Sequence, residues 1–276
     1  MQENTVIAQT VAYIDQTYSG TTLCLADYAR HGQAAVTIII ERGVQVVFTA
    51  CSIPAAAITF KCQPYSRVLF LVESSAQQPD VQAQFEWYLE EKSTVECVIM
   101  GTITGEIVMN IDFHVQGIGA RVSCRALIAV ADGARATLKT RQLHTAEHTT
   151  STVRVHTLVG TSQFDYRGTI DIDQTSIHAK AIQVNKNILL SAMRKVVAIP
   201  TLQVRTNIVN CVHGAAVGSV AAEQLVYLQA RGIDARRAQM LLLHGFLMDA
   251  LAGACQASVC FANQKIETMV DELRLQ

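Results

Sequence analysis

The sequence predicts a mainly β fold followed by a helical C-terminal region. Val, Ile and Thr, which favour strands, make up 75 of the 276 residues. They are unevenly placed, because 69 of them lie in residues 1–221 and only 6 in residues 222–276. In that last stretch Ala and Leu, which favour helices, supply 18 of 55 residues. We therefore expect a short N-terminal segment over residues 1–35, a β-core over residues 36–220 and a helical region over residues 221–276.

Alternating apolar and polar residues outline the strands of the β-core. Ile107, Met109 and Ile111 alternate with residues of a largely polar face, as expected of a strand that is buried on one side. Asp132 and Gly133 supply a tight turn, because both residues tolerate positive φ. Strands spaced by roughly 8–12 residues fit a sandwich, a barrel or a β-solenoid, and periodicity does not choose among them. Strand-like runs lie in order at residues 35–40, 107–115, 122–130, 136–143, 152–159, 164–172, 176–184 and 202–209.

Three helices are expected in the C-terminal region. The run from Glu223 to Arg231 predicts a short helix that ends before Gly232, and Asp234 is the expected N-cap of the next helix. That second helix is apolar nearly all round, which predicts burial or a face shared with a partner. The last helix carries one apolar stripe, which either packs on the β-core or docks another subunit. The apolar positions of these two helices are Leu241, Leu242, Leu243, Phe246, Leu247, Leu251, Ile266, Met269, Val270 and Leu273.

Composition excludes several classes of protein. Half of the residues are apolar, 16% are charged and the net charge is -1, which fits neither a disordered chain nor a basic nucleic-acid binder. Residues 1–19 lack the basic and apolar regions of a secretion signal, and the uncharged run at residues 43–60 suits strands better than a membrane span. The eight cysteines lack the dense spacing of a disulfide scaffold. We expect a cytoplasmic protein that binds neither nucleic acid nor membrane.

Two groups of residues could carry chemistry. His144, Glu147 and His148 spell H-x-x-E-H, the pattern of the inverted zincins, so a zinc-dependent hydrolase is one alternative. The flanking residues favour strand and loop over helix, which favours a chance match. Cys211 and His213 lie two apart and share a face of a strand, but a structural zinc site uses four ligands. The sequence has no nucleophile elbow, P-loop or dinucleotide fingerprint, so we do not expect an enzyme.

Six blocks of residues in the second half of the chain carry a resemblance: residues 164–172, 185–191, 200–204, 210–218, 223–233 and 243–246. Together they resemble the SufB/SufD family of iron–sulfur cluster assembly proteins. Their order and spacing match over about a third of the chain, which is more specific than any one block. The block Asn210-Cys-Val-His-Gly-Ala-Ala-Val-Gly218 resembles the SufD form, because the SufB form has an acidic residue after the histidine. The chain therefore resembles SufD most closely, as a short and divergent member.

The resemblance implies an architecture and a set of partners. It implies a right-handed parallel β-helix (β-solenoid) core with a C-terminal helical region. It also implies a scaffold subunit of a SUF-type complex, which pairs through its β-helix with a SufB-like subunit or with an identical chain as a dimer. The C-terminal helices would dock a SufC-like ABC ATPase, whose ATP-driven motion rearranges the paired scaffold. A β-solenoid interaction protein without assembly activity is the alternative.

The resemblance also implies site residues. The interface histidine of SufD corresponds to His213, and Cys211 lies beside it on the same strand. Both side chains suit iron, so they are the candidate ligands of a transient iron–sulfur cluster at the subunit interface, with no cofactor bound stably. The assembly cysteine of SufB would fall at Arg194, and no cysteine occurs between Cys124 and Cys211. The SufB role is therefore not expected of this chain.

Overall fold

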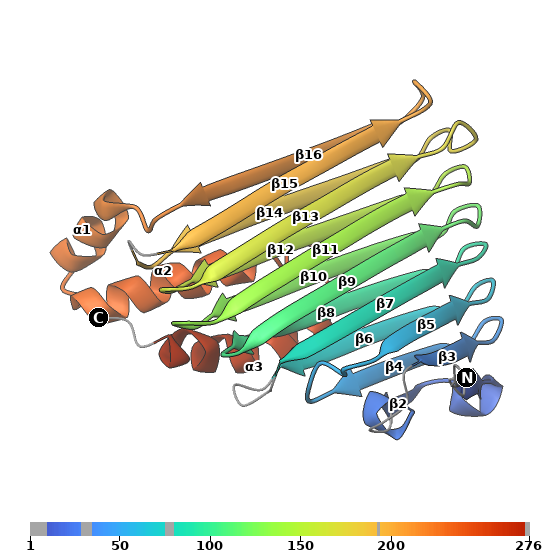
Figure 1. The fold of residues 1–276 in the computed structure, drawn as a ribbon, viewed down its shortest axis with the longest axis horizontal. Coiled ribbons are helices and arrows are strands. Elements are labelled where there is room, and N and C mark those ends of the chain that lie inside the picture. The colour runs from blue at the N-terminus through green and yellow to red at the C-terminus, as the bar shows by residue number, and fades with distance from the viewer. Residues whose placement is uncertain (1–9, 29–34, 75–79, 192–193, 274–276) are drawn as a thin grey trace, which may run out of the picture.

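Two parallel β-sheets make up most of the computed structural model, which describes residues 10–28, 35–74, 80–191 and 194–273. Odd-numbered strands form one eight-stranded sheet and even-numbered strands form the other. The strand pairs within each sheet are parallel, and the chain changes sheet after each strand. The result is a β-solenoid with two strands per turn and its core between the sheets (Figure 1). The predicted β-solenoid is confirmed.

The sheets widen from the N-terminal to the C-terminal end. Strands have 4 or 5 residues at the start and 9 or 10 from β7 onward. The odd-numbered sheet contains β1 (Thr10–Ile14), β3 (Ala35–Ile40), β5 (Ala57–Cys62), β7 (Val81–Leu89), β9 (Glu106–Val115), β11 (Arg135–His144), β13 (Gln163–Ile172) and β15 (Lys195–Val204). The even-numbered sheet contains β2 (Thr21–Cys24), β4 (Gln45–Ala50), β6 (Arg67–Ser74), β8 (Thr94–Ile103), β10 (Arg121–Val130), β12 (Thr150–Val159), β14 (Lys180–Leu189) and β16 (Asn210–Gly218). The long strands therefore lie at the end that carries Cys211 and His213.

Side chains alternate between the core and the outer faces of the sheets. Ile107, Met109 and Ile111 of β9 are buried, as their alternation predicted. Gly133 has a φ of 78° in the predicted Asp-Gly turn. In the N-terminal half the core is aromatic, and Trp87 stacks on Phe60 with ring centroids 3.9 Å apart. Burial of such large apolar rings is a principal source of stability in this half.

Two details of the strand prediction differ from the structure. β1 and β2 lie within residues 1–35 and pair with β3 and β4, so the sheets begin before residue 36. The ends of two predicted strands are misplaced: the run at residues 176–184 starts before β14, which begins at Lys180, and the run at residues 202–209 extends beyond β15, which ends at Val204, while β16 begins at Asn210. Ile208 and Val209 favour strand by type, but the chain needs residues 205–209 to cross from one sheet to the other.

Three helices follow the solenoid: α1 (Ala222–Ala230), α2 (Ala235–Asp249) and α3 (Gln256–Glu272). The Asp234 carboxylate accepts a hydrogen bond from the Arg237 backbone at 3.0 Å and caps α2, as predicted. α2 and α3 cover the outer face of the even-numbered sheet, where Leu247, Ile266 and Val270 pack with apolar residues of β6, β8, β10 and β12. The apolar stripe of the last helix thus packs on the β-core. Within the described chain, none of these helices has both the length and the apolarity to cross a membrane.

Hydrogen bonds connect α2 and α3 to the even-numbered sheet. The Glu96 carboxylate on β8 accepts a hydrogen bond from the Cys255 backbone at 3.0 Å, at the start of α3. His156 on β12 is hydrogen-bonded to the Phe246 carbonyl of α2 at 2.8 Å. α1, by contrast, has no buried residue and extends away from the sheets (Figure 1). The helical region therefore has one face on the solenoid and another that is free.

Candidate functional site at the open end of the solenoid

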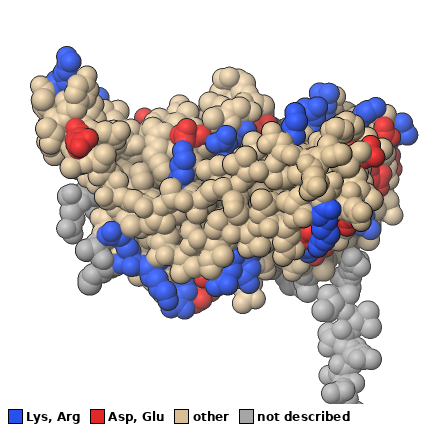
Figure 2. Space-filling model, turned by 90° about the horizontal axis from the view of Figure 1, so that it is seen from above, with Lys and Arg blue, Asp and Glu red and all other residues tan. Residues whose placement is uncertain are grey.

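The solenoid ends at β15 and β16, each of which pairs with another strand along one edge only. Leu202, Val204 and Val217 lie in register with buried residues of the previous turn, yet they are 37%, 40% and 48% exposed. Figure 2 looks onto this end and shows a broad uncharged surface with Lys, Arg, Asp and Glu mostly around its margin. An unpaired apolar strand edge is a ready template for pairing with another chain.

Cys211 and His213 both face the interior side of this last turn. Cys211 is in register with Ala181 and His213 with Gln183, and both of these partners are buried between the sheets. Cys211 is half-buried and His213 is exposed. Burial raises the pKa of the Cys211 thiol, although a backbone hydrogen bond at Ala181 opposes this rise. The end of the solenoid thus presents a thiol and an imidazole on one side of one strand.

A polar interior lies directly beneath these two residues. The side-chain amide of Gln142 donates to the Gln183 side chain at 3.4 Å, across the space between the sheets. Gln142 Oε1 and Gln183 Nε2 are buried and have no hydrogen-bond partner among the described residues. Asn185 and Asn187, on the same side of β14, are buried too. None of these side chains was predicted as part of a site, and the signal for them is polar residues at every second position of residues 183–187.

Hydrogen bonds hold the last turn in place. The Asn187 amide donates to the Ala216 carbonyl of β16 at 3.1 Å. Asp171 pairs with Arg141 at 2.8 Å and with Arg205 at 2.6 Å. Burial acts to raise the pKa of Asp171, but the two arginines outweigh it and hold that pKa below its usual range. The open end is therefore a structured surface, anchored to the turn before it.

The structure does not place His144, Glu147 and His148 on one helix, as the pattern of the inverted zincins would. His144 ends strand β11 and is buried, with its two ring nitrogens hydrogen-bonded to Thr149 and Ser151, each at 2.7 Å. His148 lies in the following turn with a φ of 57° and stacks on His178. No helix joins the motif, and the part of the chain that is described contains no group of three or more His, Cys, Asp or Glu side chains placed to hold a metal.

His144 should make the stability of the fold depend on pH. Burial lowers its pKa to about 4, whereas a histidine of the unfolded chain titrates near 6.5. Acid therefore protonates the unfolded state first. From pH 7.5 to pH 5, we expect His144 to lower the free energy of unfolding by about 2 kcal/mol. Denaturant titrations at the two pH values measure this change in the free energy of unfolding. In His144→Gln the change should be smaller by about 2 kcal/mol. The same change in the variant as in the wild type would contradict a lowered pKa of His144.

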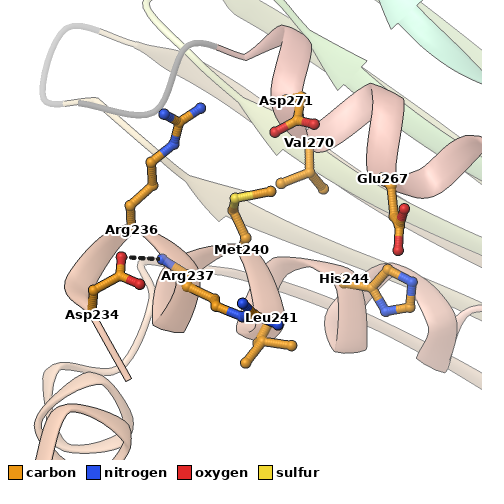
Figure 3. A pocket seen from close by; sticks show the side chains of 9 residues that line it. All are labelled: Asp234, Arg236, Arg237, Met240, Leu241, His244, Glu267, Val270 and Asp271. Atoms are coloured by element: carbon orange, nitrogen blue, oxygen red, sulfur yellow. Dashed lines mark hydrogen bonds between the residues drawn. The ribbon is translucent and has the colours of Figure 1, made fainter. Parts of the chain in front are cut away.

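A groove between α2 and α3 lies on the free face of the helical region. Its volume is about 520 Å³, and in Figure 3 Met240 of α2 and Val270 of α3 point toward one another within it. Arg236 and Arg237 line the α2 side, while the α3 side is acidic. Next to it, α1 exposes Val226 and Tyr227 to 62% and 59%. The lining residues are Asp234, Arg236, Arg237, Met240, Leu241, His244, Glu267, Val270 and Asp271.

Comparison with known proteins finds matches to one family. The family described as "SUF system FeS cluster assembly, SufBD core domain" matches residues 32–246. The iron–sulfur cluster assembly protein SufD of Escherichia coli is 33% identical over 81 residues, which cover 29% of this chain and 19% of that protein. Protein ABCI7 of Arabidopsis thaliana chloroplasts is 34% identical over 87 residues, covering 32% and 18%. A SufBD family iron–sulfur cluster assembly protein of Synechocystis is 30% identical over 90 residues, covering 33% and 20%. The matches span about a fifth of the length of these relatives.

Proposed function

The chain belongs to the SufBD core-domain family of the SUF system, and on this premise we propose that it is a non-enzymatic scaffold subunit of an iron–sulfur cluster assembly complex. The observation that carries the proposal is the open end of the solenoid, where two strands with one unpaired edge each expose apolar side chains beside Cys211 and His213. The scaffold works in the cytoplasm, which suits the eight unpaired thiols.

The open end pairs with a SufB-like subunit or with a second copy of this chain. β15 and β16 offer free backbone groups along one edge each, and strand addition satisfies such groups while it covers apolar side chains. The surrounding surface carries few charges, which lowers the cost of removing it from water. Pairing at this end brings the partner directly over Cys211 and His213.

A nascent iron–sulfur cluster is the cargo of the paired subunits. The thiolate of Cys211 and the imidazole of His213 are ligand types that iron accepts, and both lie on the interior side of the last turn, at the end where the partner pairs. Two ligands from one subunit leave coordination positions for the partner and for sulfide. Because this chain supplies only two of the ligands, the cluster is held transiently and is then released.

The SufC-like ABC ATPase docks on the free face of the helical region. Leu241 is 48% exposed in the α2–α3 groove, and α1 extends beside it with Tyr227 exposed. Opposite faces of α2 and α3 pack on the even-numbered sheet, so a force applied to the helices reaches the solenoid. ATP-driven movement of the ATPase thus rearranges the paired scaffold.

Leu241→Glu tests this docking. A carboxylate in the apolar part of the groove should weaken binding of the purified ATPase by roughly tenfold or more, because it must be desolvated in the interface. Calorimetric titration measures the affinity. Ile118→Glu is the matched control, since Ile118 is 55% exposed in a turn of the solenoid. Equal binding by both variants would contradict docking at the groove. If the wild-type protein binds no ATPase, the result would favour the alternative of an interaction protein without assembly activity.

A further inference from the structure

Three cationic side chains line a hollow at a corner of the solenoid, where the chain crosses from the even-numbered to the odd-numbered sheet. The hollow has a volume of about 310 Å³, and Arg135, Arg194 and Lys195 are the only charged residues among the described ones that line it. Arg135, Gln163 and Lys195 occupy the same register position on β11, β13 and β15. Neighbouring parallel strands lie about 4.8 Å apart, so the long side chains of Arg135 and Lys195 can reach one bound group. This surface is called the basic hollow below.

A second hollow adjoins the first. It has a volume of about 330 Å³ and shares Arg135, Gln163 and Lys195 with the basic hollow. Its one acidic residue, Asp165, already pairs with Arg167 at 3.2 Å. Each hollow is at the lower limit of the size range of small-molecule sites, which is about 300–1,000 Å³.

The positive charge of the basic hollow is largely uncompensated. Among the described residues, neither Arg194 nor Lys195 forms an ion pair with a carboxylate. Arg135 approaches Glu106 only at 3.8 Å, and both side chains are more than half exposed, so this pair contributes little. The whole chain carries a net charge of -1, so the cluster does not follow from a general excess of basic residues.

We propose that the basic hollow binds a phosphate group, either as free phosphate or as part of a small phosphorylated molecule. The planar guanidinium groups of Arg135 and Arg194 suit bidentate contacts to phosphate oxygens, and Lys195 adds a point charge. The adjoining hollow has room for the organic part of such a molecule. The basic hollow is separate from Cys211 and His213, because Lys195 is the first residue of β15 and β15 begins at the opposite end of the strands from β16, which carries Cys211 near its start (Figure 1).

The proposal is tested by calorimetric titration of the intact chain with inorganic phosphate, adenosine monophosphate and acetate. Saturable binding of phosphate or of the nucleotide is expected, and it should weaken by roughly tenfold in both Arg194→Gln and Lys195→Gln, the size of one lost charge-assisted hydrogen bond. Arg121→Gln is the control, because Arg121 is an exposed arginine at the start of β10, outside both hollows. Circular dichroism checks that each variant is folded.

The outcomes separate the two sources of phosphate. Tighter binding of the nucleotide than of inorganic phosphate identifies a phosphorylated molecule, and equal binding identifies free phosphate; either supports the site. Binding that does not saturate, acetate that binds as well as phosphate, or an equal loss in Arg121→Gln would overturn the proposal. None of these results depends on cluster assembly, so the test stands apart from the scaffold function.

Discussion

Replacing Ala215 by proline should weaken the proposed pairing at the open end and leave the solenoid folded. The Asn210 amide donates to the Ala179 carbonyl of the previous turn, so Asn210 faces β14. Backbone groups alternate along a strand, so the amide of Ala215 faces the free edge. Proline removes this donor and fills the edge with its ring, and edge strands tolerate it. The association constant should fall by at least about tenfold.

The control for this prediction is Ala215→Ser, which keeps the amide and adds little volume. Sedimentation velocity of each variant with its partner subunit, or alone if the chain pairs with itself, measures association. Denaturant unfolding checks that the fold is kept. A proline variant that pairs as well as the serine variant would show that β16 does not form the interface.

His213→Ala should impair cluster assembly by roughly tenfold or more while pairing stays intact. The imidazole faces the interior side of the last turn, beside Cys211, and loss of a metal ligand costs at least as much as loss of a residue that orients one. The measurement is the visible absorbance of the cluster during reconstitution with iron and sulfide in the paired complex. His178→Ala is the control, because His178 is exposed in a turn of the solenoid. Assembly at the wild-type rate would remove His213 from the site.

The local features of the fold could be predicted because they depend on neighbouring residues. Alternation at residues 107–115 identifies the buried side of β9, and Asp-Gly at residues 132–133 marks a turn. The choice of a solenoid could not come from periodicity, since it depends on which distant strands pair. The resemblance of the six blocks to a family supplied it.

The polar interior beneath Cys211 and His213 could not be predicted either, because it too depends on which distant strands pair. Gln183 and Asn185 alternate with apolar residues, which reads equally well as a polar outer face. Only the register of β14 between β12 and β16 shows that they point inward. Arg135 and Lys195 are 60 residues apart and meet because the solenoid turns place them in one column. The H-x-x-E-H spelling likewise says nothing of the surroundings of His144, which ends its strand inside the core with both ring nitrogens hydrogen-bonded to hydroxyl groups.

Purification of the tagged chain from its native host shows directly whether the chain works as a scaffold together with an ATPase. Mass spectrometry of the purified complex should identify an ABC-type ATPase, together with either a SufB-like subunit or this chain alone as the paired scaffold. Sedimentation of the same sample should show them in one particle. A chain that purifies without an ATPase, under conditions that preserve other ATPase complexes of the host, would contradict the account.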